Sequence, residues 1–568
     1  MSKAPLIECV PNFSEGRDPV IIEQITRAIA AVAGVKLLDV DPGQATNRTV
    51  VTFVGEPAAV VEAAFQGIRK AAELIDLRHH QGEHPRMGAT DVCPLVPVAN
   101  ISMAETVEWA RKLGQRVGEE LGIPVYLYES AATQPARKNL ATIRAGEYEG
   151  LAQKLQQPEW APDYGTATFN PTAGATVIGA RDFLIAYNVN LNTSSVRRAN
   201  SVAFDVREKG RNLREGDPIT GKLVTDAAGE PVRVPGKCKG VKAIGWYIEE
   251  YGLAQISMNI TDTRATALHE AFEACRESAR TRGLRVTGSE LVGMVPLQVL
   301  LDAGKYFLAQ QERSLGISEE EIIRMAVESL GLSQLSPFDP QQKIIEYQLR
   351  ADEPTPLLKL NLRAFANETA SESPAPGGGS IAAYVGALGA SLGTMVANLS
   401  SHKRGWDDRW AEFSTWAEEG QVLKDELLRL VDKDTQAFED LMVAFRLPKG
   451  SPAEQAERQA AIQAATHGAM ATPLQVMEAA SRLFPLCRAM VEQGLVASVS
   501  DAGVGALCAR AAIHGAYLNI KTNASGLKDA AVRSAMLARA ATLLAQADEK
   551  EREILALVHE VIEKGGKG

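Results

Sequence analysis

The stretch SPAPGGGSIAAYVGALGASLGTMVANLSSHKR (residues 373–404) decides the fold of the second half of the chain. It holds no charged residue before Lys403 and is long enough to cross a bilayer as a helix. However, small residues such as Gly386, Gly389 and Gly393 let helix backbones approach closely, as in helical bundles. We therefore predict a buried helix of a bundle rather than a membrane span, and we see no second segment of this kind.

The residues that follow residue 357 continue this helical pattern. They are rich in Ala and poor in aromatic and β-branched residues, and their apolar positions recur with helical spacing. Before them, the breaker PFDP at 337–340 and a polar, Pro-containing stretch predict a linker over residues 337–357. We therefore predict an all-α bundle domain over residues 358–568.

Strand and helix patterns alternate in the first half. The strand patterns cover residues 6–10, 35–40, 48–54, 92–98, 124–128, 183–191, 241–249 and 254–260. The helical patterns cover residues 19–33, 57–73, 102–121, 195–208, 263–282, 296–313 and 318–330. This order predicts two α/β subdomains of split-βαβ-like layout, over residues 1–182 and 183–336. The Gly-, Pro- and Asp-rich stretch 212–239 predicts a protruding hairpin or loop.

Composition excludes several classes of protein. The 568 residues include 60 Lys and Arg against 70 Asp and Glu, so a generally basic surface for nucleic acid is not expected. Six scattered cysteines without CxxC spacing form neither a disulfide framework nor a thiolate zinc site. The beginning of the chain has no long apolar signal segment. We expect a cytoplasmic enzyme without a metal, a nucleic-acid partner or a membrane partner.

The stretch RHHQGEHPRMG (78–88) concentrates three of the eight histidines in a predicted loop. His84 could move a proton near neutral pH. His80 and His84 are four residues apart, but Gly82 and Pro85 disfavour one helical face that would present both to a metal. A solvated structural turn explains the same residues equally well.

Two further stretches could bind a ligand. Asp39 and Arg48 flank a polar turn and could hold an amidine and a carboxylate, although a plain turn explains these residues better. The uncharged segment 165–174 (GTATFNPTAG) could wrap a flat heterocycle or simply connect the subdomains. The run PGGGS ending at Ser380 could admit a ligand to a helix N-terminus, or form a tight turn.

Asp434 interrupts an apolar helical stripe. The apolar members of the stripe are Leu427, Val431, Phe438, Leu441 and Phe445. Asp434 completes their spacing, so it occupies a position where helical periodicity predicts a core side chain. A buried carboxylate is costly unless it is paired or protonated, which indicates a functional group. A salt bridge to a cation of another helix is the alternative.

Several motifs resemble enzymes of formimino-group metabolism. ECVPNFSEG (8–16), TNRTV (46–50), residues 82–88 and DVCP (91–94) resemble glutamate formimidoyltransferases. Residues 375–380, 430–438 and LPK (447–449) resemble formimidoyltetrahydrofolate cyclodeaminases. Their order and the joining segment 337–347 resemble the bifunctional formimidoyltransferase-cyclodeaminase family. Residues 212–239 depart from the animal enzymes by their length.

The resemblance implies two reactions of histidine degradation and one-carbon metabolism. The first moves the formimino group of N-formimino-L-glutamate to the co-substrate tetrahydrofolate, with or without a polyglutamate tail. The second closes the product to 5,10-methenyltetrahydrofolate and releases ammonia. The resemblance also implies a homo-oligomer, His84 and Asp434 as catalytic residues, and a folate-binding segment. That segment consists of Gly165, Thr166, Ala167, Thr168, Phe169, Asn170, Pro171, Thr172, Ala173 and Gly174.

Charge suggests further substrate contacts. We expect Asp39 or Glu83 to steady the cationic amidine, and Arg48 or Arg86 to bind a substrate carboxylate. In the second half the candidates for substrate binding are Ser380, Lys403, Arg404, Lys449, Asp501, Asn519 and Asn523. The three cations could hold the acidic tail of folate. Surface cations, helix caps and interhelical hydrogen bonds explain these residues equally well.

Two other functions fit the same sequence. The helical domain could hydrolyse methenyltetrahydrofolate, as a cyclohydrolase does. The whole chain could also be a folate-binding protein without catalysis, although His84 and Asp434 together argue against that function.

Overall fold

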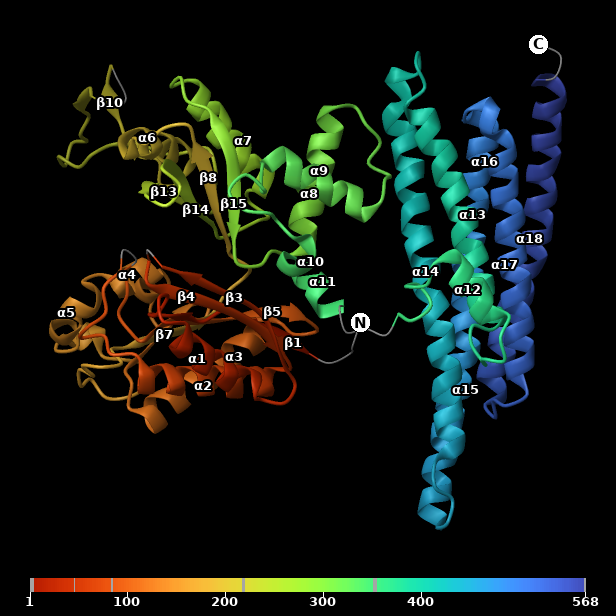
Figure 1. Cartoon of the computed structure of the whole chain (residues 1–568), viewed down its shortest axis with the longest axis horizontal. Helices are drawn as coiled ribbons and strands as arrows, with labels where there is room; N and C mark the ends of the chain where they lie inside the picture. The colour runs from red at the N-terminus through yellow and green to blue at the C-terminus, as the bar shows by residue number, and fades with distance from the viewer. Residues whose placement is uncertain (1–4, 45, 83–84, 217–219, 351–354, 566–568) are drawn as a thin grey trace. The chain divides into compact units, whose positions relative to one another are not determined.

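The computed structural model of the chain describes residues 5–44, 46–82, 85–216, 220–350 and 355–565 (Figure 1). The chain forms two compact units. One consists of Met1–Ala303 with Ala326–Ala351, and the other of Gly304–Met325 with Asp352–Gly568. The predicted architecture, two α/β subdomains followed by an all-helical region, is confirmed.

The first subdomain is a mixed sheet covered on one face by helices. Its strands are β1 (Leu6–Cys9), β2 (Asn12–Phe13), β3 (Val35–Gly43), β4 (Arg48–Gly55), β5 (Thr90–Ala99), β6 (Val125–Glu129) and β7 (Thr176–Ala180). β1 lies between β4 and β5, β3 pairs with β4, and the parallel strands β7 and β6 extend the sheet beyond β5. The covering helices are α1 (Pro19–Ala30), α2 (Pro57–Leu74) and α3 (Met103–Leu121).

Local sequence explains where these elements begin. Ser102 accepts a hydrogen bond from the Glu105 backbone N–H, and the Glu105 carboxylate accepts from the Ser102 backbone N–H in return. This capping box starts α3 at the predicted residue. Between β6 and β7 the chain forms only short helices: Pro135–Arg137, α4 (Leu140–Arg144), α5 (Glu147–Lys154) and Pro158–Trp160.

The second subdomain repeats the split-βαβ order of the first. β8 (Ile185–Leu191), β13 (Val241–Ile248), β14 (Leu253–Ile260) and β15 (Val286–Val292) form an antiparallel sheet in the order β13-β14-β8-β15. Helices α6 (Val196–Val206) and α7 (Leu268–Arg280) pack on one face. The predicted hairpin at 212–239 is present as two small ribbons. They are β9 (Arg211–Asn212) with β12 (Arg233–Val234), and β10 (Arg214–Glu215) with β11 (Lys222–Leu223).

The stretch predicted as a linker contains regular structure. α10 (Pro340–Lys343) and α11 (Ile345–Arg350) lie within it, after α8 (Leu297–Gln310) and α9 (Glu319–Leu330). Residues Gly304–Met325, which the sequence assigned to the second α/β subdomain, belong to the helical unit. Asn398 and Gln421 both donate hydrogen bonds to the Gly316 carbonyl, which explains this attachment.

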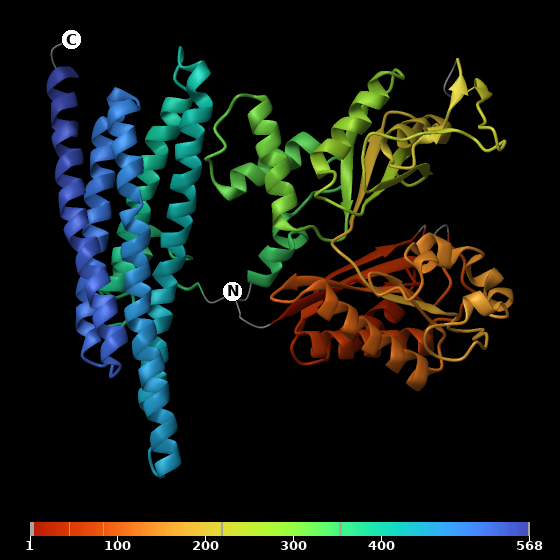
Figure 2. The same ribbon diagram turned by 180° about the vertical axis from the view of Figure 1, so that it is seen from behind.

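The helical unit is built around one uncharged helix. Its helices are α12 (Leu362–Thr369), α13 (Gly378–Ser401), α14 (Trp410–Arg446), α15 (Pro452–Ser481), α16 (Leu483–Gln493), α17 (Val499–Ala524) and α18 (Ala530–Gly565), as Figure 2 shows from behind. A Cβ at Gly389 would lie 2.9 Å from the Gly505 carbonyl oxygen. The small residues of α13 therefore permit its close antiparallel packing on α17, as predicted.

One expectation about membranes was wrong. Val496–Ala524 passes the same length and composition test as Gly378–Ser401, so two helices in the described part of the chain are apolar enough to span a bilayer. The apolar stretch is 50% buried in Val496–Ala524 and 61% buried in Gly378–Ser401. Core helices of soluble proteins pass this test too, because partner helices such as α13 and α17 must each bury an apolar face.

Candidate active sites

Three loops at one end of the first sheet are interlocked by Asn47. Its side-chain oxygen accepts a hydrogen bond from the Gly16 N–H at 3.0 Å, and its side-chain NH₂ donates to the Gln81 carbonyl at 3.0 Å. Its own carbonyl lies 2.8 Å from Nε2 of His80. Asn47 is buried and has a φ of 47°, a conformation that Asn tolerates better than most residues. The motifs at 8–16, 46–50 and 78–88 therefore form one structure.

His80 and Arg86 hold the two flanks of the predicted catalytic loop. Arg86 Nε donates to His80 Nδ1 at 3.1 Å, so Nε2 carries the proton and donates to Asn47. Burial lowers the pKa of His80, and the neighbouring Arg86 adds to this effect. His84 and Glu83 lie outside the described residues, so their predicted roles stay predictions.

The structure gives Arg86 partners within the protein. Its guanidinium makes a bidentate ion pair with Glu149, at 3.0 and 2.8 Å, and donates to the His80 carbonyl at 3.2 Å. The exposed fraction of its side chain is 12%. These contacts fix the loop after residue 85, whereas a substrate carboxylate would have to compete with Glu149 for the same donors.

The other predicted charges lie on β3 and β4: Arg48 at the end that pairs with Gly43, and Asp39 in the middle of β3 opposite Thr52. Burial raises the pKa of Asp39, and Lys343 of α10, 3.3 Å away, opposes the shift. Burial lowers the pKa of Arg48 to about 10, so Arg48 remains a cation at neutral pH. Repulsion from Arg144 adds to this lowering, whereas Asp91 and Asp41 oppose it.

Sequence reasoning missed the buried pair of Asp91 and Arg144. Asp91 is 1% exposed, accepts a hydrogen bond from the Met87 N–H at 3.0 Å and forms an ion pair with Arg144 of α4. The DVCP motif could have indicated this pair, because its carboxylate stands at the beginning of a buried strand. Its partner lies more than fifty residues later, on a short helix that was not predicted.

The predicted folate-binding segment joins the histidine loop. Gly88 and Gly174 form an isolated bridge, and a Cβ at Gly174 would lie 2.2 Å from the Met87 carbonyl oxygen. Tyr148 connects the two stretches from the other side. Its N–H donates to the Arg86 carbonyl at 2.9 Å, and its ring lies 5.5 Å from that of Phe169.

The two ends of this segment differ in exposure. Residues 165–168 are exposed, whereas Ala173 and Gly174 are buried. The side-chain oxygen of Asn170 accepts hydrogen bonds from the N–H groups of Thr172 and Ala173 and thereby forms a local turn. An exposed, irregular start and a fixed end suit a ligand-covering loop, and its binding role stays a prediction.

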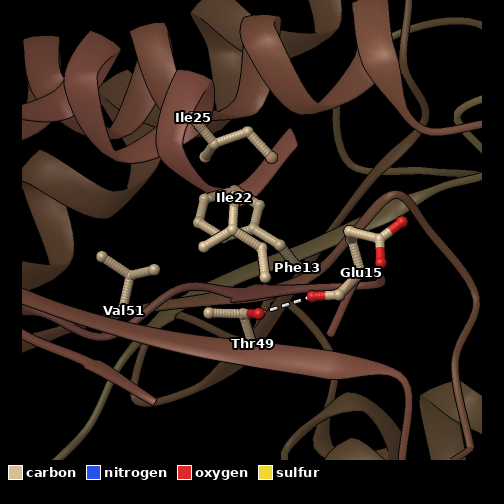
Figure 3. Close-up of a pocket in the computed structure, with 6 residues that line it drawn as sticks. All are labelled: Phe13, Glu15, Ile22, Ile25, Thr49 and Val51. Carbon is tan, nitrogen blue, oxygen red and sulfur yellow. Dashed lines mark hydrogen bonds between the residues drawn. The ribbon is translucent and has the colours of Figure 1, made fainter. Parts of the chain in front are cut away.

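A small recess lies on the helix-covered face of this sheet (Figure 3). It is lined by Phe13, Glu15, Ile22, Ile25, Thr49 and Val51 and has an empty volume of about 160 Å³. Ligand pockets are typically several hundred cubic ångströms, so this recess is too small for a folate. In the described part of the chain, no three His, Cys, Asp or Glu residues converge as metal ligands.

In the helical unit, Asp434 lies at the N-terminus of α13. Ser380 Oγ donates to its carboxylate at 3.2 Å, and a Cβ at Gly379 would lie only 2.3 Å from its Oδ1. Burial raises the pKa of Asp434, and the hydrogen bonds from Ser380 oppose the shift. Among the described residues, no cation lies within 4.0 Å of this carboxylate, so the predicted alternative of a salt bridge is not observed.

The stripe that contains Asp434 is buried over only half its length. Leu427 and Val431 are fully buried, but Phe438 and Phe445 are 39% and 47% exposed. The prediction of a continuous core-facing stripe was therefore wrong beyond Asp434. The reason is that α14 and α15 extend as a hairpin past the other helices of the bundle (Figure 1).

The structure brings two of the other candidates to Asp434. Ser380 contacts it directly, and a Cβ at Gly378 would lie 3.5 Å from the side-chain nitrogen of Asn519. Asn523, one turn further along α17, donates to the Ala469 carbonyl at 2.9 Å. These residues come from α13, α14 and α17 and surround one end of the bundle.

The remaining candidates lie at the opposite end of the bundle or, in the case of Lys449, on the α14–α15 hairpin beyond Asp434. Lys403 and Arg404 follow the far end of α13, about 35 Å from Ser380 at 1.5 Å per residue. Lys403 stacks over the Trp406 ring at 3.9 Å. Asp501 lies in the first turn of α17, whose last turns carry Asn519. Lys449 lies in the turn of the α14–α15 hairpin.

Comparisons with known proteins agree with this two-part construction. Family models match at residues 6–181 (formiminotransferase domain, N-terminal subdomain), 186–350 (formiminotransferase domain) and 361–542 (formiminotransferase-cyclodeaminase). The formimidoyltransferase-cyclodeaminase of Rattus norvegicus is 43% identical over 97% of this chain and 98% of its own.

Two shorter relatives match one half each. The glutamate formimidoyltransferase of Thermoplasma acidophilum is 45% identical over 53% of this chain and 92% of its own. The methenyltetrahydrofolate cyclohydrolase of Methylorubrum extorquens is 35% identical over 35% of this chain and 95% of its own. Taken with the full-length relative, these matches show that the chain belongs to the formiminotransferase-cyclodeaminase family and is an enzyme with glutamate formimidoyltransferase and cyclodeaminase activities.

Proposed function

We propose that the first half transfers the formimino group of N-formimino-L-glutamate to N5 of tetrahydrofolate, and that His84 moves the proton. The junction of the histidine loop with the segment 165–174 through Gly88 and Gly174 carries this proposal. N5 attacks the amidine carbon and forms a tetrahedral intermediate. One imidazole then takes the proton from N5 and gives it to the departing nitrogen of glutamate.

We assign the substrate charges to groups on β3 and β4 of the same sheet and on the histidine loop. Arg48 is a half-buried cation that suits a carboxylate of formiminoglutamate. Asp39 suits the cationic amidine, although Lys343 already contacts it, and Glu83 is the second candidate for that role. Arg86 positions the loop through Glu149 and His80 rather than contacting substrate.

In the second half, we propose that Asp434 is the acid of ring closure. N10 of the folate attacks the formimino carbon, and ammonia leaves once its nitrogen has gained a proton. A half-buried carboxylic acid without a cationic partner holds its proton more tightly than an exposed one, which suits it to donate that proton. Ser380 orients the carboxyl group, and Asn519 is a candidate contact to the folate.

A second candidate activity for the helical half is hydrolysis of methenyltetrahydrofolate. The specific observation is the 35% identity with a cyclohydrolase that the chain covers over 95% of its length. An acid at the position of Asp434 could serve either reaction. Product analysis distinguishes the two reactions, because only cyclodeamination releases ammonia.

We propose a homo-oligomer in a reducing, cytoplasmic compartment. Apolar side chains of the adjacent helices α13 and α17 remain exposed, which favours association with a second copy. They are Leu388, Met395, Leu399, Val504 and Leu507. All six cysteines are free thiols, five of them buried, which suits a reducing compartment.

A coupled assay tests these proposals. The full chain is mixed with formiminoglutamate and tetrahydrofolate, while glutamate, ammonia and methenyltetrahydrofolate are followed together. Equal release of all three supports both halves. Release of glutamate without ammonia would contradict the deaminase assignment and favour hydrolysis, which the same protein should then show with methenyltetrahydrofolate as substrate.

A further inference from the structure

The sheet of the second subdomain has one apolar and one polar face. Tyr187 and Met258 lie on the face toward α7, since Met258 contacts Cys275 of that helix and Tyr187 lies directly opposite Met258 in the paired strand. The alternate positions of β8 and β14 carry Asn188, Asn190 and Gln255 on the opposite face, which neither α6 nor α7 covers (Figure 1). Asn190 and Gln255 are nevertheless 0% and 1% exposed.

The amides of this face are linked in a chain. Trp246 Nε1 donates to Gln255 Oε1 at 3.1 Å, and Gln255 Nε2 donates to Asn190 Oδ1 at 2.8 Å. Asn190 in turn donates to Gln334 at 2.6 Å. These amides therefore satisfy one another, and the network has a defined orientation.

Glu290 of β15 ends this network. Only its Oε2 receives hydrogen bonds from the amides, from Asn188 at 3.2 Å and from Gln255 at 3.5 Å. In the described part of the chain, no Lys, Arg or His lies within 4.0 Å of the carboxylate. The carboxylate is half-buried, and its two amide hydrogen bonds replace only part of the hydration it has lost.

Tyr251 connects this carboxylate with the candidate transferase site. Burial raises the pKa of Tyr251, and the charges of Glu290 and of Asp41 add to the rise. Asp41 lies on β3, where it pairs with Val50 of β4, between Asp39 and the turn that leads to Arg48. Tyr251 is therefore within electrostatic range of both Glu290 and Asp41 of β3, the strand that also carries Asp39.

We propose that Glu290, oriented by Asn188 and Gln255, binds a planar N–C–N hydrogen-bond donor of the transferase substrates. A carboxylate accepts two parallel N–H bonds from such a group, in the manner of an arginine–carboxylate pair. Two groups have this chemistry: the aminopyrimidine ring of tetrahydrofolate and the amidine of formiminoglutamate. The inference rests on the proposed transferase function.

Glu290→Gln tests the proposal in the full chain, because it keeps the shape and removes the charge. The KM for each substrate is measured by glutamate release, with the other substrate saturating. The KM for one substrate should rise about 10- to 100-fold, as expected for a lost charged hydrogen-bond pair, with kcat changed less than about threefold. A rise for tetrahydrofolate assigns the aminopyrimidine, and a rise for formiminoglutamate assigns the amidine.

Glu249→Gln is the matched control, because Glu249 is an exposed acid at the end of β13 in the same subdomain. It should leave both KM values unchanged. If Glu290→Gln does not fold, Asn188→Ala replaces it, since it loosens the carboxylate and should raise the same KM by a smaller factor. Both KM values within twofold of wild type, or a fall in kcat alone, would overturn the proposal. A wild-type chain that releases no glutamate would instead contradict the transferase function itself.

Discussion

The two halves of the chain bury acidic groups in opposite ways. Asp91 in the transferase half receives a backbone N–H and the guanidinium of Arg144, so its charge is compensated. Asp434 in the helical half receives hydrogen bonds from Ser380 but has no cation among the described residues, and burial raises its pKa. An ion pair favours the charged form of a carboxylate, whereas burial without a cation favours the protonated form. The halves therefore need different proton carriers: a histidine on a loop in one, a carboxylic acid on a helix in the other.

His84→Ala should produce the largest effect. We expect transfer to fall by about 10³- to 10⁴-fold, because one imidazole serves two proton transfers. Cyclodeamination of supplied 5-formimidoyltetrahydrofolate should remain at the wild-type rate. His79→Ala is the control, since the side chain of His79 is 80% exposed in the same loop. Equal losses in both variants, measured as glutamate release, would remove His84 from the mechanism.

Asp434→Asn should affect only the other half. We expect ring closure to slow by about 10²- to 10³-fold, because the amide cannot give up a proton to the departing ammonia. Glutamate release should continue, so 5-formimidoyltetrahydrofolate should accumulate. Asp440→Asn, an exposed change two turns further along α14, is the control. Methenyltetrahydrofolate formed at the wild-type rate would show that another group is the acid.

Asn47→Gly should give a smaller loss confined to the transferase. Glycine keeps the positive φ but removes the side-chain hydrogen bonds to Gly16 and Gln81. The loop that carries His84 is then no longer held in place by Asn47. We expect kcat for transfer to fall about tenfold, because small misplacements of catalytic groups are costly. Asn100→Gly is matched, because Asn100 also has a positive φ, of 54°, but is exposed. If both variants lose the same activity, the loop interlock has no role in positioning.

The sequence predicted the order of the main helices and strands, but it did not predict every strand. Alternating strand and helix patterns predicted both split-βαβ units, and the capping box predicted the start of α3. β7 was missed because its five residues directly follow the irregular segment 165–174. β15 was missed because TGSEL combines polar residues with glycine, and its pairing with β8 supplies what its composition lacks.

The candidate sites likewise contain some residues that the sequence predicted and others that only the structure shows. Motifs and periodicity singled out His84 and Asp434, whereas the hub at Asn47 depends on the Gly16 N–H and the Gln81 carbonyl, which come from loops distant in sequence. Charge alone also could not show that Lys403 lies at the opposite end of α13 from Ser380. A charged residue type carries no information about the helix that lies between the two positions. The apolar stripe through Asp434 likewise could not show where the partner helices end.

The raised pKa of Asp434 also predicts a small effect on stability. The folded state holds this proton more tightly than the unfolded chain, so it binds more protons between the two pKa values. Stability should therefore fall as pH rises through that window. Asp434→Asn removes the titration and should unfold at a higher temperature than wild type above the window, and at the same temperature below it. Thermal unfolding of the helical half from about pH 4 to about pH 8 measures this, with Asp440→Asn as control. A lower unfolding temperature for Asp434→Asn at neutral pH would mean that the ionised carboxylate stabilises the bundle, and the contrast with Asp91 would then disappear.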